Sequence, residues 1–151
     1  MQNILDIKKL REETGAGILE VKQALEKYNN DYTKAYSELM SKAAAKAERK
    51  SERTTKDGLV EAYIHSGGKI GSLVVVACET DFVAKTDAFK KLCHEIALQV
   101  ATEDYENSET LLASEYIRDS SKKISDLIVE TTAKVGEKIE LKKFVRFSVT
   151  E

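Results

Sequence analysis

A strongly apolar run limits what this chain can fold into. Residues 70–77 include Leu73-Val74-Val75-Val76, which would place apolar, mostly β-branched side chains on both faces of an extended chain. Such a run is typical of a sheet strand with little solvent exposure. Before it, Val60, Ala62 and Ile64 alternate with more polar residues, as in a half-buried strand. Glycines between the two segments predict a hairpin.

The rest of this region predicts two helices and one more strand. Apolar residues recur at helical spacing in residues 89–100 and 124–135, and Gly136 is a natural C-cap for the second helix. A final strand is expected in residues 139–149, with its apolar side chains on one face and Lys143 as the exception. The order of elements predicts an α+β fold, with a three-stranded antiparallel sheet packed with helices.

The first fifty residues have the spacing of three short helices. Asn3 is a suitable N-cap for the first helix, and Thr14-Gly15-Ala16-Gly17 interrupts it. Asn29-Asn30 ends the second helix, and Asp31 is a suitable N-cap for the third. This spacing resembles that of ubiquitin-associated (UBA) domains, which are small three-helix docking modules.

These patterns predict two domains with a charged segment in each. We expect a UBA-like N-terminal module over residues 1–50, a basic helical tail to about residue 56, and an α+β core domain over residues 57–151. The tail is expected to be a solvated helix end, with contact to RNA as the alternative. Residues 103–119 are acidic and predict a solvated loop followed by a helix start.

Composition argues against several classes of protein. The chain has 151 residues, a net charge of −2 and a pI of about 5.8, which does not suggest direct nucleic-acid binding. No apolar run approaches the roughly 20 residues of a membrane helix, and residues 1–9 have no signal-peptide character. We therefore expect a cytoplasmic protein that does not associate with a membrane.

The few soft nucleophiles do not predict an enzyme. Cys78 and Cys93 are the only cysteines and lack metal-ligand spacing, so we expect reduced packing residues and neither a metal nor a cofactor. His94 adjoins Cys93, but neighbours on a helix point about 100° apart and cannot form a catalytic dyad.

The segment Cys78-Glu79-Thr80-Asp81-Phe82-Val83 links the apolar strand to the following helix. Phe82 falls outside the apolar stripe of that helix. It either plugs the gap between strand and helix or projects as a wedge for a partner, and the spacing alone leaves both interpretations open.

Three segments resemble one known family. Cys-Glu-Thr-Asp-Phe-Val-Ala-Lys at residues 78–85 resembles the signature of elongation factor Ts, the nucleotide exchange factor for the translational GTPase EF-Tu. Leu-Arg-Glu-Glu-Thr-Gly-Ala-Gly at residues 10–17 is similar to the family's N-terminal signature. Lys134-Val135-Gly136-Glu137 with Phe144-Val145-Arg146-Phe147 resembles its closing strand. The three matches occur in the family's order and cover nearly the whole chain.

The resemblance implies a guanine nucleotide exchange factor that binds GDP-bound EF-Tu. Thr80, Asp81, Phe82 and Val83 would insert beside the site where EF-Tu holds Mg²⁺ and GDP. Phe82 would be the wedge, and Asp81 would accept hydrogen bonds that disturb the network around the metal.

The resemblance also implies two further contacts with EF-Tu. Arg11, Ile18 and Leu19 match the docking positions of the N-terminal module, and His65 lies in a hairpin that touches EF-Tu in the family. Because Ile18 and Leu19 are adjacent on a helix, both cannot face the three-helix core, so one is expected to be exposed.

One departure from the family predicts a homodimer. Longer members carry two related core subdomains, whereas this chain has room for one, so a second copy would present its hairpin and sheet edge beside the first copy's Asp81 and Phe82. The alternatives are a non-catalytic docking adaptor that uses the UBA-like head, and an EF-Tu-binding paralogue without efficient exchange. A further alternative is a weak RNA-binding protein, and only the basic residues in 42–56 support that interpretation.

Overall fold

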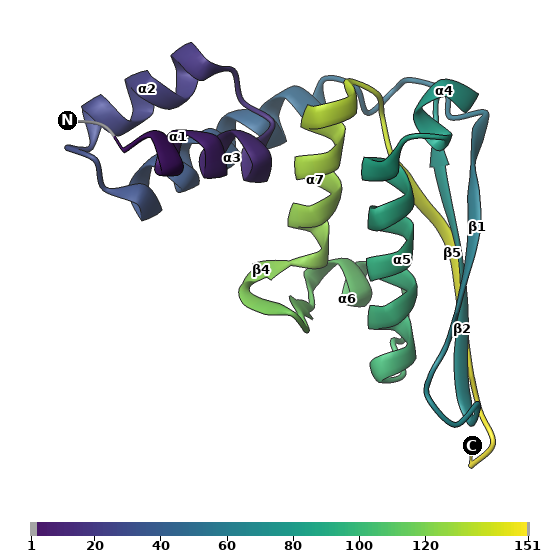
Figure 1. The fold of residues 1–151 in the computed structure, drawn as a ribbon. Coiled ribbons are helices and arrows are strands. Elements are labelled where there is room, and N and C mark those ends of the chain that lie inside the picture. Colours follow the sequence, from purple (N-terminus) through teal and green to yellow (C-terminus); the bar gives the residue numbers. More distant parts are fainter. Residues whose placement is uncertain (1–2, 151) are drawn as a thin grey trace.

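The computed structural model describes residues 3–150, so residues 1, 2 and 151 of the two predicted domains lie outside it. Three N-terminal helices form one group, and the rest of the chain forms a sheet covered on one face by helices (Figure 1). The helices are α1 (Ile4–Thr14), α2 (Ile18–Lys27), α3 (Tyr32–Glu48), α4 (Asp81–Ala84), α5 (Asp87–Thr102), α6 (Ser108–Ala113) and α7 (Ile124–Val135). The strands are β1 (Asp57–Ile64), β2 (Ile70–Cys78), β3 (Glu115–Tyr116), β4 (Asp119–Lys123) and β5 (Glu140–Ser148).

The N-terminal helices begin and end where the capping residues predict. The Asn3 side chain accepts the Leu5 N–H at 3.0 Å at the start of α1. Gly15 ends that helix in the left-handed conformation, with φ of 71°. Asp31 caps α3 by accepting the Lys34 N–H. The three helices fit a UBA-like module, and their own small core consists of Leu10, Val21, Ala24, Leu25, Ala35 and Leu39.

The main sheet has the strand order β1-β2-β5, and both pairs are antiparallel, as predicted. Helix α5 packs on one face of this sheet, and α7 lies beside α5 on the same side (Figure 1). Among residues 3–150, no helix covers the other face. On the covered face, Val76 is paired with Leu59 on β1 and with Leu141 on β5. These side chains pack against buried residues of α5, including Phe89, Leu92 and Ile96.

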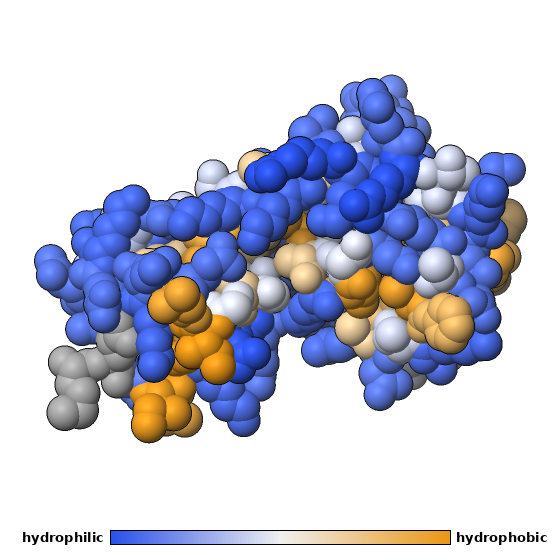
Figure 2. Space-filling model, turned by 90° about the horizontal axis from the view of Figure 1, so that it is seen from above, coloured by the Kyte–Doolittle hydropathy of each residue, from blue (hydrophilic) through white to orange (hydrophobic). Residues whose placement is uncertain are grey.

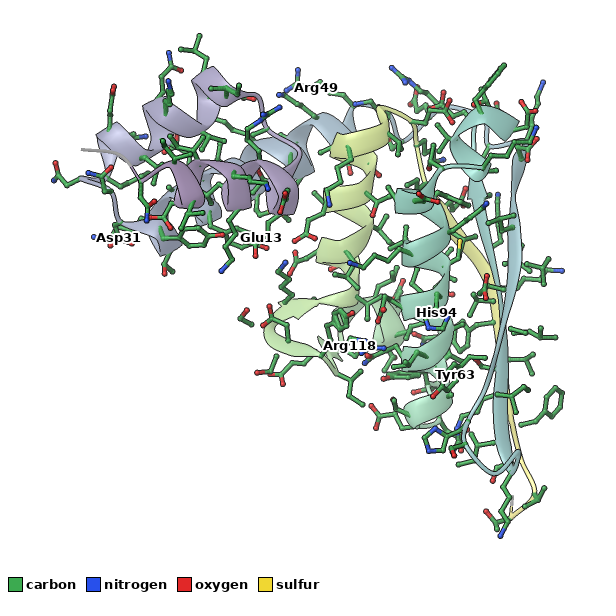
Figure 3. The ribbon with its side chains drawn as sticks, in the orientation of Figure 1. Glu13, Asp31, Arg49, Tyr63, His94 and Arg118 are labelled. Carbon is green, nitrogen blue, oxygen red and sulfur yellow. The ribbon has the colours of Figure 1, made fainter. Side chains whose placement is uncertain are left out.

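The two faces of β1 are the reverse of what the hydrophobic pattern indicates. Val60 and Ile64 are 67% and 65% exposed, and Ala62 between them is also exposed. Glu61 and Tyr63 point instead to the helical side of the sheet. Tyr63 contacts His94 on α5 edge to face, with ring centroids 6.0 Å apart (Figure 3). The more polar face of this strand is therefore the one that packs.

The apolar residues of β5 do not share one face, because the strand contains a β-bulge. Val76 pairs with Leu141 whereas Val75 pairs with Lys143, so Lys142 has no partner in the ladder. The inserted residue reverses the alternation. Ile139 and Leu141, before the bulge, face the core, but Val145 and Phe147 beyond it point to the open face. The prediction of one apolar face with Lys143 as the exception is wrong for this reason.

The acidic segment contains more structure than the predicted loop. Asn107 caps the short helix α6 by accepting the Thr110 N–H at 2.8 Å. A small hairpin of β3 and β4 then leads into α7. The hairpin escaped prediction because β4 reads Asp-Ser-Ser-Lys-Lys, which has no apolar alternation.

The N-terminal helices are attached to the rest of the molecule through α7. The Tyr36 hydroxyl on α3 donates to Glu130 on α7 at 3.0 Å, and Lys122 Nζ lies 2.9 Å from the same carboxylate oxygen. At the other end of this contact, a Cβ on Gly15 would lie only 2.7 Å from the Ala133 Cβ. Helices α1 and α3 therefore approach α7 closely, and a buried carboxylate joins α3, α7 and the small hairpin.

Candidate partner-binding surface

The chain turns a corner between β2 and α5, and this corner presents Phe82. Thr80 is the N-cap of the single-turn helix α4, where its Oγ1 accepts the Val83 N–H at 3.4 Å. The predicted loop is thus a helical turn, too short for its periodicity to be read from sequence. Val83 and Ala84 are buried in the core, whereas Phe82 is 80% exposed. Phe82 therefore does not plug the gap between strand and helix, because the two residues that follow it do.

Asp81 is the second exposed group at this corner. Its carboxylate lies 3.1 Å from Lys85 Nζ, one helical turn later, and both side chains are more than half exposed. An exposed pair of this kind contributes little to stability, so the carboxylate can exchange the lysine for another partner at small cost.

Glu137 holds the chain just before the corner. Its Oε1 accepts the N–H groups of Glu79 and Thr80 at 3.1 and 3.0 Å, and its Oε2 accepts the Thr80 hydroxyl at 2.7 Å. Glu137 belongs to the segment that resembles the family's closing strand, but the resemblance assigns no role to it. No local signal could have found it, because its partners lie 57 and 58 residues away in the chain.

The N-terminal module presents a second apolar surface. Ile18 and Leu19, in the first turn of α2, are 49% and 69% exposed, so both of them point away from the core. Arg11 is exposed near the end of α1, and its carbonyl accepts the Gly15 N–H at 2.9 Å. Ile4 and Leu5 add exposed apolar area to the same module. Figure 2 shows hydrophobic side chains gathered at this end of the molecule.

His65 lies at the tip of the β1–β2 hairpin. Its N–H donates to the Ile70 carbonyl, and its ring Nδ1 lies 3.1 Å from the Tyr63 hydroxyl. Figure 1 places this hairpin at the end of the sheet opposite to α4, while the N-terminal helices lie on the far side of α7. The predicted contact residues therefore form three separate surfaces and not a single pocket.

Two ion pairs, Arg118 with Glu95 and Lys122 with Glu130, lie between α5, α7 and the small hairpin. These four residues line a cavity of about 260 Å³. Glu95 accepts the Tyr116 hydroxyl at 2.6 Å and Arg118 Nε at 2.7 Å, with Arg118 reaching across from the hairpin (Figure 3). Burial raises the pKa of Glu130 above its ordinary value, although Lys122 and Tyr36 act against this shift. None of the predicted contact residues lines this cavity.

The remaining reactive groups are packing residues. Cys78 and Cys93 are free and buried, and burial raises the pKa of the first thiol to about 11 and of the second to about 12. Within residues 3–150, no group of three or more His, Cys, Asp or Glu side chains could hold a metal ion. No helix among these residues has both the length and the apolar character required to cross a bilayer.

Comparison with known proteins agrees with the resemblance seen in the sequence. A family model described as "Elongation factor TS" matches residues 79–151. Elongation factor Ts of Coprothermobacter proteolyticus is 40% identical over 190 aligned residues, covering 96% of this chain and 96% of the relative. Elongation factor Ts of Thermotoga maritima is 39% identical over 188 residues, covering 96% and 94%. Elongation factor Ts of a Nostoc species is 42% identical over 145 residues, covering 96% of this chain and 46% of the relative.

The alignment lengths also show a difference. Alignments of 190 and 188 positions exceed the 151 residues of this chain, so these relatives contain residues for which this chain has no counterpart. The identity nevertheless extends over nearly all of both proteins. This chain belongs to the elongation factor Ts family.

Proposed function

We propose that this chain is a guanine nucleotide exchange factor for EF-Tu and that it promotes GDP release through the corner at residues 80–83. The observation that supports this most is the exposure of Phe82, which is 80% accessible although the two residues after it are buried. A large aromatic side chain held in water on a fixed backbone is suited to fill a pocket on a partner. Because EF-Tu acts in the cytoplasm, we also propose that this protein is cytoplasmic.

The corner would act on the metal that helps to hold the nucleotide. Phe82 would enter between helices of the GTPase domain, and Asp81 would exchange its weak pair with Lys85 for hydrogen-bond donors on EF-Tu. A bound Mg²⁺ is a large local charge, so disturbing the network around it weakens the hold on the diphosphate. Thr80 and Val83 serve this step by fixing the turn on which the two exposed residues stand.

Exchange of this kind breaks no covalent bond. The chain and GDP each lower the affinity of EF-Tu for the other, and by linkage the two factors are equal. In this mechanism the protein is an exchange factor and not an enzyme that transforms a substrate. The mechanism requires no cofactor bound to the protein itself.

The N-terminal module would supply a separate contact. We propose that residues 1–50 and 57–151 act as two domains and that Arg11, Ile18 and Leu19 dock the first on EF-Tu. The exposure of both Ile18 and Leu19 supports this, because adjacent apolar side chains left in water are typical of a surface that binds a partner. His65 would add a contact at the hairpin tip.

A second copy of the chain would cover the open face of the sheet. The residues on this face form two cross-strand rows, one of Ala62, Leu73 and Val145 and one of Ile64, Gly71 and Phe147. A hollow of about 420 Å³ lies along this face. An apolar face of this kind on an isolated chain marks an interaction site. We propose a homodimer formed through this face, where the sequence alone suggested the hairpin and the sheet edge.

The direct test is the release of fluorescent GDP from bacterial EF-Tu, followed by stopped flow with increasing amounts of this chain. We expect the release rate to rise and then to saturate as the complex fills. An unchanged rate, together with binding in a pull-down, would reduce the chain to an EF-Tu-binding paralogue. An unchanged rate without binding would support the docking adaptor.

A further inference from the structure

The corner that carries Phe82 is tied to a distant part of the chain by two carboxylates. Glu137 lies just after α7, and it accepts the backbone N–H groups of Glu79 and Thr80 together with the Thr80 hydroxyl. In the opposite direction, Glu79 Oε1 accepts the Lys138 N–H at 2.7 Å. Each carboxylate thus binds the backbone beside the other. We call these contacts the carboxylate clasp.

The clasp satisfies backbone groups that the sheet leaves behind. β2 ends at Cys78, so the N–H groups of Glu79 and Thr80 no longer belong to a strand ladder. Both are partly buried, and partly buried donors require an acceptor. An ionised carboxylate forms stronger hydrogen bonds to backbone N–H groups than a neutral acceptor does.

The clasp also fixes the direction of α4. The Thr80 hydroxyl donates to Glu137, and its oxygen accepts the Val83 N–H. The bond to Glu137 therefore orients the hydroxyl group that caps α4. This arrangement fixes the side-chain rotamer of the cap and hence the start of the helical turn. Phe82 lies in that turn, only two residues after Thr80, and its side chain is 80% exposed.

The position of Glu137 depends in turn on a helix end. Gly136 ends α7 with φ of 75°, which directs the chain toward β5 and places the next residue opposite Thr80. Arg53, in the segment between the two predicted domains, reaches Glu79 at 3.3 Å and the Gly136 carbonyl at 3.5 Å. The clasp therefore joins the β2–α4 junction, the α7–β5 junction and the interdomain segment.

We infer that Glu137 is a positioning residue for nucleotide exchange, because it holds Thr80 so that Phe82 projects in a fixed direction. This inference rests on the proposed exchange function. Glu137 acts through Thr80, and the contact with the partner is made by Phe82. Loss of the clasp should therefore lower the rate of GDP release from the complex more than it weakens formation of that complex.

The exchange test uses Glu137→Ala, which removes all three bonds, and Glu137→Gln, which keeps the volume but not the charge. Glu140→Ala is the matched control, since Glu140 lies on the same chain segment and pairs with Lys138 and Lys142 away from the corner. We expect Glu137→Ala to lower the maximal release rate by about tenfold, with a smaller loss for Glu137→Gln. The half-saturating concentration should change by less than about twofold.

A second readout needs no partner. The chain contains no tryptophan, so Phe82→Trp creates a single reporter at the corner. Time-resolved fluorescence anisotropy should show a larger amplitude of nanosecond motion when Glu137→Ala is added, and no change when Glu140→Ala is added. Circular dichroism checks that each variant remains folded, and Glu137→Gln serves where Glu137→Ala does not fold.

The outcomes separate the two proposals. If the wild-type chain accelerates GDP release and both Glu137 variants retain the wild-type rate, the positioning role is overturned and the exchange function stands. Unchanged reporter motion in both Glu137 variants would overturn it as well. If the wild-type chain does not accelerate release, the exchange function fails and the positioning role fails with it, whatever the reporter shows.

Discussion

The corner at Phe82 and the tip of the N-terminal module both expose apolar side chains, but they are held in different ways. At the corner a single exposed aromatic residue, Phe82, directly precedes Val83 and Ala84, which are buried in the main core. At the tip, Ile18 and Leu19 stand on the first turn of a helix that belongs to a separate, smaller core. The corner is fixed by hydrogen bonds to the backbone, and the tip by helix packing.

This difference suggests that the corner and the module have different roles in binding EF-Tu. The corner belongs to the body of the protein and cannot move without breaking the clasp around Thr80. The module is attached to that body through α7, with Tyr36 and Glu130 at one contact and Gly15 at another. We expect the corner to set how fast GDP leaves, and the module to set how tightly EF-Tu is held.

Phe82→Ala should have the largest effect. Loss of a buried aromatic anchor typically costs more than about 2 kcal/mol, so the maximal rate of GDP release should fall by about thirtyfold. Stopped-flow release of fluorescent GDP measures this rate. Ile117→Ala is the control, because Ile117 is also exposed, at 58%, but lies on the small hairpin away from the corner. A Phe82→Ala variant as fast as this control would remove the corner from the mechanism.

Leu19→Asp should have the second largest effect, and on the other kinetic quantity. A charge in an apolar docking surface should raise the half-saturating concentration by about tenfold while the maximal rate stays the same. Thr33→Asp places the same charge on an exposed site of α3 in the same module. If Leu19→Asp lowers the maximal rate instead, the proposed division between corner and module is wrong.

Phe147→Ala should weaken association between two copies of the chain. Phe147 is 68% exposed in the row with Ile64 and Gly71, so truncation should raise the dimer dissociation constant by about fivefold. Light scattering across micromolar concentrations measures the dissociation constant. A wild-type chain that is monomeric throughout this range would contradict the dimer and leave the corner and the module to act from one subunit.

The smallest effect concerns the attachment of the module. Burial raises the pKa of Glu130 above 4.5, so the folded state binds its proton more tightly than the unfolded state does. This contribution to stability is complete below pH 4.5 and is lost as the pH rises through the raised value. The free energy of unfolding of the wild type should therefore fall relative to that of Glu130→Gln as the pH rises from about 4 to 7. Urea unfolding at several pH values measures the free energy of unfolding of both proteins. A difference that does not change with pH would show that folding does not shift the pKa of Glu130.

The sequence predicted the helices better than the sheet faces, and the reason is physical. Helix ends depend on local groups such as Asn3, Asp31 and Gly136, which act within one turn. The faces of β5 depend on one inserted residue, Lys142, and a bulge has no signal in the strand itself. The apolar face of β1 was expected to be buried, and it is the face left open in a single copy of the chain.

The site, too, was predictable only where it depends on residues close together in the chain. Phe82 lay outside the apolar stripe of the next helix, so its exposure was one of two interpretations that the sequence allowed. The exposure of both Ile18 and Leu19 goes beyond the one residue expected. Glu137 could not be assigned, because its three bonds reach residues far away in the chain. Side-chain bonds to distant backbone groups leave no periodic pattern.

The central claim is that this chain and GDP oppose each other on EF-Tu through the corner. The most direct measurement is the dissociation constant of the chain for nucleotide-free EF-Tu and for GDP-loaded EF-Tu, by isothermal titration calorimetry in the same buffer. The account predicts binding at least about tenfold weaker to the GDP-loaded form, and a ratio near one for Phe82→Ala. Equal affinities of the wild-type chain for the two forms would contradict it.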